Sequence, residues 1–87
     1  MHIRYFAWLR EIIGVGSEEV TMDSTGANPT PSVMDLVAQL RTTSPAHAKA
    51  FTDLTKIRVA VNHEYADLTH PLKTGDEVAF FPPVTGG

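Results

Sequence analysis

The sequence predicts an α+β fold in which a mixed β-sheet packs against one main helix, with short extra helices. Three observations favour this class: strands that alternate in polarity near both ends of the chain, one amphipathic helical segment between them, and the order β-β-α-β-β. A chain of 87 residues has room for one compact core. We therefore expect one domain over residues 1–81 and an extended tail over residues 82–87.

The first third of the chain predicts two strands with a short helix between them. Residues 2–9 alternate between apolar and polar side chains and predict a strand. Residues 8–13 predict one or two helical turns that stop at Gly14. Residues 17–23 predict a short polar strand. Because the two strands are close in sequence, we expect them to form a hairpin.

The main helix is predicted after a loop over Ser24–Pro31 that is rich in Gly, Asn, Pro and Thr. Thr30 is the expected N-cap, with Pro31 at the first helical position. Ser44-Pro45 is expected to end this helix, and residues 45–54 to form another short one. Four apolar residues at positions i, i+3, i+4 and i+7 predict the face that packs on the sheet: Val33, Leu36, Val37 and Leu40.

The second half of the chain predicts the remaining strands. Residues 56–62 carry the strongest strand signal, because β-branched side chains alternate there with polar or small ones. A turn at 62–64 leads to a short return strand at 65–68. A connecting turn at 71–76 then precedes the last strand at 77–81, which two prolines end.

Composition excludes several functional classes. Seven Lys and Arg against ten Asp and Glu give a net charge of −3, which argues against nucleic acid or an anionic membrane as the main partner, although a local basic patch is compatible with that total. The chain has no cysteine and therefore no thiolate metal site or cysteine-borne persulfide. It shows no signal-peptide pattern and no apolar run long enough to span a membrane, so we expect a cytoplasmic protein.

The polar residues show no self-contained catalytic group. The histidines at 2, 47, 63 and 70 lack metal-ligand spacing and are expected to be exposed to solvent. The serines are typical of turns and caps, and no glycine-rich phosphate loop is present. This absence favours a role as substrate or carrier over a role as catalyst.

The C-terminal segment is the unusual feature of the sequence. Pro82-Pro83 cannot donate ladder hydrogen bonds and favours an extended conformation, so it directs the tail away from the sheet. The tail could reach about 20 Å at about 3.3 Å per residue. Gly86-Gly87 has no side chains, so it can enter a narrow channel with its carboxylate unshielded. A carboxylate presented in this way can be adenylated and then attacked by a nucleophile.

Phe81 is the candidate docking residue next to this tail. Val78 and Phe80 share one face of the last strand, and Phe81 lies on the other. If the first pair fills the core, Phe81 lies outside and offers an aromatic anchor to a partner. The alternative is that both faces are covered and Phe81 belongs to the core.

Motifs along the whole chain match those of one known family. They are Phe6-Ala7, Leu9-Arg10-Glu11 and Gly14 near the start, Ala60-Val61-Asn62 and His70-Pro71-Leu72 further on, and Gly75 through Gly87 at the end. On these residues the chain resembles the small, sulfur-carrying subunits of molybdopterin synthase, which have a ubiquitin-like β-grasp fold. The last thirteen residues are the most specific part. The long Ser24–Pro31 loop departs from the pattern.

The resemblance implies a function for the tail. A separate E1-like adenylating enzyme would use ATP to activate the carboxylate of Gly87, and a sulfur-transfer system would convert it to a thiocarboxylate. The tail would then enter the large subunit of molybdopterin synthase, in a heterotetramer, and donate sulfur to cyclic pyranopterin monophosphate to build the molybdopterin dithiolene. The carrier itself would bind no cofactor or metal and would have no active site of its own.

The same resemblance assigns roles to particular residues. Gly87 would carry the sulfur, Gly86 would be the spacer in the channel, and Arg10 would be a further partner contact. The docking segment would consist of Phe81, Pro82, Pro83, Val84 and Thr85. Two alternatives remain: a sulfur carrier for another pathway, such as thiamine synthesis or tRNA thiolation, and a β-grasp interaction module that carries no sulfur.

Overall fold

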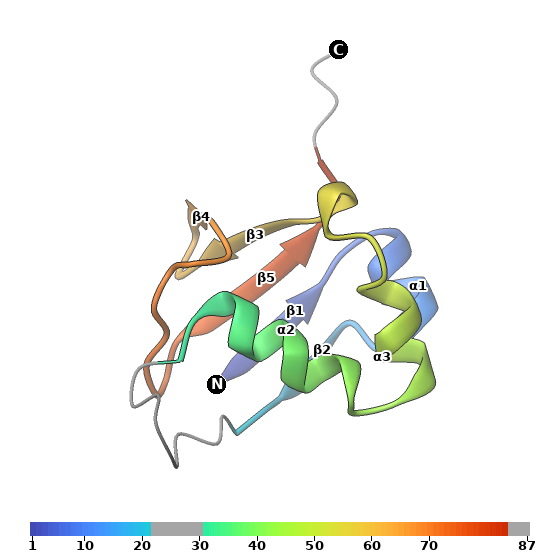
Figure 1. Ribbon diagram of the computed structural model, residues 1–87, viewed down its shortest axis with the longest axis horizontal. Helices are drawn as coiled ribbons and strands as arrows, with labels where there is room; N and C mark the ends of the chain where they lie inside the picture. Colours follow the sequence, from blue (N-terminus) through green and yellow to red (C-terminus); the bar gives the residue numbers. More distant parts are fainter. Residues whose placement is uncertain (22–30, 84–87) are drawn as a thin grey trace.

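The computed structural model, which describes residues 1–21 and 31–83, has strands and helices that form two layers (Figure 1). The elements follow one another as β1 (His2–Tyr5), α1 (Trp8–Ile13), β2 (Ser17–Glu19), α2 (Val33–Arg41), α3 (Pro45–Ala50), the 3-10 helix η1 (Leu54–Lys56), β3 (Arg58–Val61), β4 (Glu64–Ala66) and β5 (Glu77–Phe81). This order confirms the predicted α+β class: two strands precede the main helix α2, three strands follow it, and the short helices are additions.

One mixed sheet contains all five strands, in the order β2-β1-β5-β3-β4. The predicted hairpin is confirmed, because β1 pairs antiparallel with β2. The last strand, β5, lies in the centre of the sheet, parallel to β1 and antiparallel to β3. It covers residues 77–81 as predicted. The C-terminal end of the chain therefore leaves the domain from its central strand.

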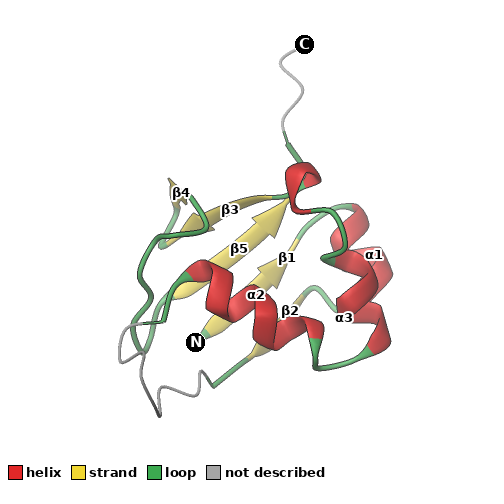
Figure 2. Ribbon diagram, in the orientation of Figure 1, coloured by secondary structure: helices red, strands yellow, loops and turns green. Residues whose placement is uncertain are grey.

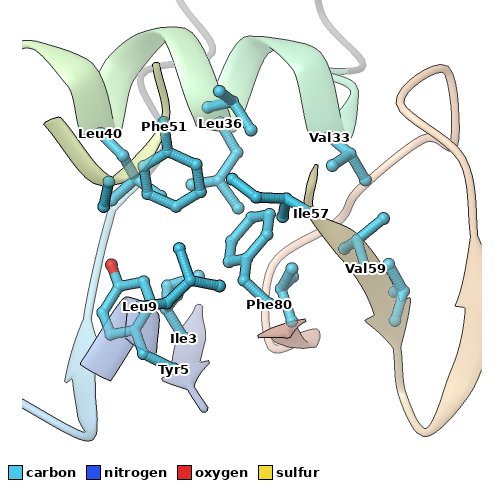
Figure 3. Close-up of a cluster of buried hydrophobic side chains, with 14 of the residues drawn as sticks. Ile3, Tyr5, Leu9, Val33, Leu36, Leu40, Phe51, Ile57, Val59 and Phe80 are labelled. Carbon is cyan, nitrogen blue, oxygen red and sulfur yellow. The ribbon is translucent and has the colours of Figure 1, made fainter. Parts of the chain in front are cut away.

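The helices cover one face of this sheet and enclose the core (Figures 2 and 3). All four predicted apolar positions of α2 are buried. They pack with strand residues that include Ile3, Tyr5, Val59 and Phe80. The longest helix, α2, has 9 residues, and no helix within residues 1–21 and 31–83 is long and apolar enough to cross a membrane.

The start of α2 differs from the prediction. The N-cap is Ser32, whose hydroxyl accepts a hydrogen bond from the Asp35 N–H, and the Asp35 carboxylate accepts one from the Ser32 N–H at 2.7 Å. This reciprocal pair satisfies two backbone donors at the helix end, so Ser32 is the better cap. Pro31 precedes the cap, and its carbonyl accepts from the Leu72 N–H. Thr30, the expected cap, and most of the Ser24–Pro31 loop lie outside the described residues.

Several shorter elements also differ from their expected bounds. The first strand ends at Tyr5, because Ala7 has φ 54° and turns the chain into α1. The expected helix over 45–54 is α3 followed by the separate turn η1. The strand expected at 17–23 ends at Glu19, although its last two positions lie outside the described residues.

Candidate functional site

The candidate site begins where β5 ends, because the predicted tail starts there. In the sheet, Phe80 of β5 lies opposite Tyr5 of β1 and Val59 of β3. Its buried ring stacks on the Tyr5 ring at 6.3 Å between centroids and meets the edge of Phe51 at 5.0 Å. The base of the tail is therefore held by the middle of the sheet and by the core beneath it (Figure 3).

The other end of β5 is held by two polar side chains from the matched motifs. The Asn62 amide donates to Asp76 Oδ1 at 3.0 Å, and Asn62 Oδ1 accepts from the Glu77 N–H at 3.0 Å. The Lys73 N–H donates to the second oxygen of Asp76. Burial alone would raise the pKa of Asp76, but the hydrogen bonds from Asn62 and Lys73 hold it below its ordinary value. These motif residues therefore position the strand.

The face of the sheet opposite the helices carries the predicted docking residue. Phe81 is half-buried there, on the other side of β5 from Phe80, as expected. Its ring lies 5.7 Å from the ring of Tyr65, which is 78% exposed. Phe6 is 41% exposed, and its N–H donates to the Phe80 carbonyl, so it lies beside the end of β5. Three aromatic side chains thus adjoin the start of the tail.

Small side chains lie across the middle of this face. In the strand register, Arg4, Ala79, Ala60 and Tyr65 lie opposite one another in one row. Because the two alanine side chains are small, they protrude little from the sheet between Arg4 and Tyr65, which lie at the two ends of the row. We call the surface formed by Phe6, Ala60, Tyr65, Ala79 and Phe81 the open sheet face. Its mixture of aromatic and small apolar groups is typical of a surface that a partner covers.

The tail itself is described only at its beginning. Pro82 and Pro83 follow β5, are half-buried and belong to no strand, in agreement with their predicted effect on the ladder. The other predicted tail residues lie outside the described residues: Val84, Thr85, Gly86 and Gly87. Their roles in docking and sulfur transfer remain predictions.

Arg10, the other predicted contact, lies on α1 and is exposed. Its side chain runs along Gly16, where a Cβ atom would lie 3.3 Å from Arg10 Nε. Arg10 borders a pocket that Arg4 and Phe6 also line. It is thus next to the Phe6 side of the open sheet face, whereas Phe81 pairs with Tyr65 on the other side.

His47 contradicts the expectation that every histidine is exposed. It is only 7% exposed, and its Nε2 atom lies 2.7 Å from Glu18 Oε2, while its Nδ1 atom lies 2.7 Å from Ser44 Oγ. Sequence reasoning missed this group because Glu18 is 29 residues away and only the fold brings it to α3. The one local signal is Ser44-Pro45, a helix start that places His47 within reach of the cap.

This Ser-His-Glu group has a structural role in the fold. The Ser44 oxygen accepts the His47 N–H as the N-cap of α3, and Glu18 also accepts a hydrogen bond from the Tyr5 hydroxyl at 2.7 Å. The hydrogen bonds from Tyr5 and His47 to Glu18 therefore link β1 and β2 to α3. Within residues 1–21 and 31–83, no three His, Cys, Asp or Glu side chains form a cluster that could hold a metal ion.

Comparison with known proteins agrees with this geometry. The model of the ThiS family matches residues 3–87. The chain belongs to the ThiS family. It is 41% identical to the molybdopterin synthase sulfur carrier subunit of Escherichia coli (strain K12), over 98% of this chain and 96% of that protein. The protein of the same name from Haemophilus influenzae is 37% identical, over 100% of this chain and 99% of its own length.

Solved structures of similar proteins have the same fold. SAMP1 from Haloferax volcanii is 34% identical and superposes with a TM-score of 0.77, over 100% of this chain and 98% of its own. A chain in the complex of subunits 1 and 2 of molybdopterin-converting factor from Helicobacter pylori is 28% identical, with a TM-score of 0.62 over 99% of this chain and 96% of that one. The family and these structures confirm the ubiquitin-like β-grasp fold.

Proposed function

We propose that this chain is the sulfur carrier subunit of a molybdopterin synthase and that Gly87 carries the sulfur. The observation that carries the proposal is the 41% identity over almost the full length of a protein of that name. The position of the tail supports it, since the segment follows directly from the central strand β5. The proposal is consistent with the absence of cysteine, because no thiol side chain on this chain competes for the sulfur.

The proposed chemistry takes place at one carboxylate. An oxygen of the Gly87 carboxylate attacks the α-phosphate of ATP on a separate E1-like adenylating enzyme, and pyrophosphate leaves. Hydrosulfide-level sulfur from a sulfur-transfer system then attacks the acyl carbon and displaces AMP, so that sulfur replaces one oxygen as a thiocarboxylate. The large subunit transfers this sulfur to cyclic pyranopterin monophosphate, water restores the Gly87 carboxylate, and two transfers complete the dithiolene. The carrier contributes a reactive terminus and a rigid base for it.

Docking in this proposal uses the open sheet face together with the tail. Phe81 and Tyr65 would pack on the large subunit, with Pro82 and Pro83 stiffening the segment that enters it. A complex of subunits 1 and 2 exists for the Helicobacter pylori protein. We place one carrier at each end of a dimer of large subunits, in a cytoplasmic heterotetramer.

Intact-mass measurement tests the carrier chemistry. After incubation with the adenylating enzyme, ATP and a sulfur donor, the mass should rise by about 16 Da, since sulfur replaces oxygen in the same group. Deletion of Gly87, or addition of one residue after it, should prevent the shift and leave far-UV circular dichroism unchanged. A full-length chain that gains no mass with its own adenylating enzyme would exclude the carrier function.

The two alternatives predict different results. A carrier for thiamine synthesis or tRNA thiolation would gain the same mass but would not bind a molybdopterin synthase large subunit. A β-grasp interaction module without sulfur would tolerate an added C-terminal residue with no loss of molybdoenzyme activity in cells. Co-purification with the large subunit, together with loss of that activity on extension, is the result expected here.

A further inference from the structure

Two arginines converge on one pocket beside the open sheet face. The pocket has a volume of about 270 Å³ and is lined by Arg4, Tyr5, Phe6, Ala7, Arg10, Gly16 and Ser17. The Arg4 guanidinium carbon lies 5.4 Å from the centre of the Phe6 ring, a cation–π distance that holds the side chain over this face. Arg10 reaches the pocket from α1 along Gly16. The two cationic groups therefore reach the pocket from two different elements, β1 and α1.

Neither arginine is neutralised within the described part of the chain. The four ion pairs among residues 1–21 and 31–83 use the N-terminal amine or a histidine, and none uses a lysine or an arginine. Arg10 shares a second pocket wall with Glu11, but the two side chains form no ion pair. Two positive charges on one small pocket repel each other, and a bound anion would relieve that repulsion.

Basic residues gather at the end of the molecule from which the tail leaves. Arg4 is near the end of β1, which runs parallel to β5, and Arg58 lies opposite Phe81 in the register. Glu19 and Glu77 lie at the other end, each opposite His2 in the register, while Glu11 and Asp53 are acidic residues on the tail side. Although the net charge of the chain is −3, Arg4, Arg10 and Arg58 form a basic region near the start of the tail.

We propose that the Arg4–Arg10 pocket receives a carboxylate side chain from the protein that accepts the tail. This inference rests on the proposed function, because it takes the large subunit of molybdopterin synthase as that protein. A guanidinium fork matches a carboxylate in a bidentate arrangement, and Ser17 can add a hydroxyl donor. The pocket adjoins Phe6 of the open sheet face, so a partner that covers this face also covers the pocket.

A partner carboxylate fits this pocket better than a nucleic-acid backbone. Binding along nucleic acid needs a track of cations that follows successive phosphates, whereas two arginines in one pocket bind a single anion. The remaining lining includes the Phe6 ring and the small residues Ala7 and Gly16, while the Tyr5 ring lies in the core on the other face of the sheet. Such walls suit the aliphatic stem of a glutamate or aspartate.

The test compares two double variants of equal charge in binding to the large subunit from the same organism. Arg4→Gln/Arg10→Gln removes both pocket charges. Lys49→Gln/Lys73→Gln removes two exposed charges outside the pocket and the open sheet face, and serves as the matched control. We expect the pocket variant to bind about tenfold more weakly and its association rate to depend less on salt. The control should bind within about twofold of the wild type.

Three further variants make the result specific. Arg4→Lys/Arg10→Lys keeps the charges but loses the bidentate fork, so it should retain the salt dependence of association and still bind more weakly than the wild type. The single variants Arg4→Gln and Arg10→Gln should each weaken binding. Thermal unfolding of every variant excludes loss of fold as the cause.

The outcomes separate this inference from the function on which it rests. If the wild-type chain binds the large subunit and the pocket and control variants lose the same affinity, the pocket does not receive a partner carboxylate. If the wild-type chain does not bind the large subunit at all, the proposed function and this inference are both overturned. A selective loss in the pocket variant supports both.

Discussion

The His47 ring and the Glu18 carboxylate form a hydrogen bond of 2.7 Å between Nε2 and Oε2, in a part of the fold where neither is fully exposed. Glu18 accepts a second hydrogen bond from the Tyr5 hydroxyl. With its proton on Nε2, the His47 ring donates to Glu18 and its Nδ1 atom accepts from the Ser44 hydroxyl. The short edge strand β2 is joined to α3 through this bond.

The ionised form of Glu18 stabilises the folded state. Burial alone would raise the pKa of Glu18, but the hydrogen bonds from His47 and Tyr5 outweigh it and lower the pKa. A carboxylate with a lowered folded-state pKa contributes stability above its unfolded pKa of about 4.3 and loses that contribution as pH falls through the folded value. We therefore expect Glu18→Gln to reduce stability near neutral pH and to flatten the loss of stability in acid.

Urea unfolding over a pH series measures this difference. The matched control is Glu64→Gln on the edge strand β4, where the carboxylate is exposed. The control should follow the pH dependence of the wild type. Equal acid dependence in the wild type and Glu18→Gln would show that Glu18 contributes no stability through its ionisation.

Two neighbouring phenylalanines on β5 separate stability from binding. Phe80 is fully buried against Tyr5 and Phe51, so Phe80→Ala should cost about 3–5 kcal/mol of unfolding free energy. Phe81 contacts the exposed Tyr65 on the open sheet face, so Phe81→Ala should cost about 1 kcal/mol. The second variant should nevertheless lose affinity for the large subunit. Denaturant melts measure the stability of both variants, and binding isotherms measure their affinity for the large subunit. A large stability loss in Phe81→Ala would place that ring in the core.

Two substitutions of Asn62 separate its side-chain bonds from its backbone conformation. Asn62 has φ 51° in the two-residue turn between β3 and β4, and its side chain bonds Asp76 and the Glu77 N–H. Asn62→Gly keeps the turn but loses these bonds, which should cost about 1–3 kcal/mol because buried Asp76 loses a donor. Asn62→Ala should cost about 1 kcal/mol more, since alanine is strained at positive φ. Equal unfolding free energies of Asn62→Gly and Asn62→Ala would contradict the strain expected for alanine at this φ.

The sequence predicted those parts of the fold whose signals are local and periodic. The apolar face of α2 and the alternation around Val59 and Val78 each appear within a few residues, and the structure has these side chains buried. The two sides of β5 follow from the same period of two, which is why Phe81 could be assigned to the open sheet face. The tail was predicted from Pro82-Pro83 and Gly86-Gly87, its residues' roles in sulfur transfer came from the resemblance, and the structure describes only Pro82 and Pro83 among them.

The contacts that were missed join residues far apart in sequence. His47 meets Glu18 only after β2 and α3 are packed together, and Arg4 and Arg10 line one pocket only because the chain turns at Ala7 into α1. The cap of α2 was placed two residues early, because Thr30-Pro31 and Ser32 both fit a helix start and the contact with Asp35 selects the second.

The turn at Ala7 leads to the last prediction, which concerns strain. Ala7 has φ 54° and ψ −132°, a region that glycine occupies readily and other residues rarely do. The N–H of Phe6 is bonded to β5 on one side and the Ala7 carbonyl accepts from the Glu11 N–H on the other, so neighbouring bonds hold this conformation. We expect Ala7→Gly to raise the unfolding free energy by about 1 kcal/mol, because relief of strain exceeds the entropy that glycine adds to the unfolded chain. The matched control is Ala38→Gly on the exposed side of α2, which should lower it by about 1 kcal/mol. If both variants lose the same stability in denaturant melts, Ala7 is unstrained, and the turn from β1 into α1 is determined by packing alone.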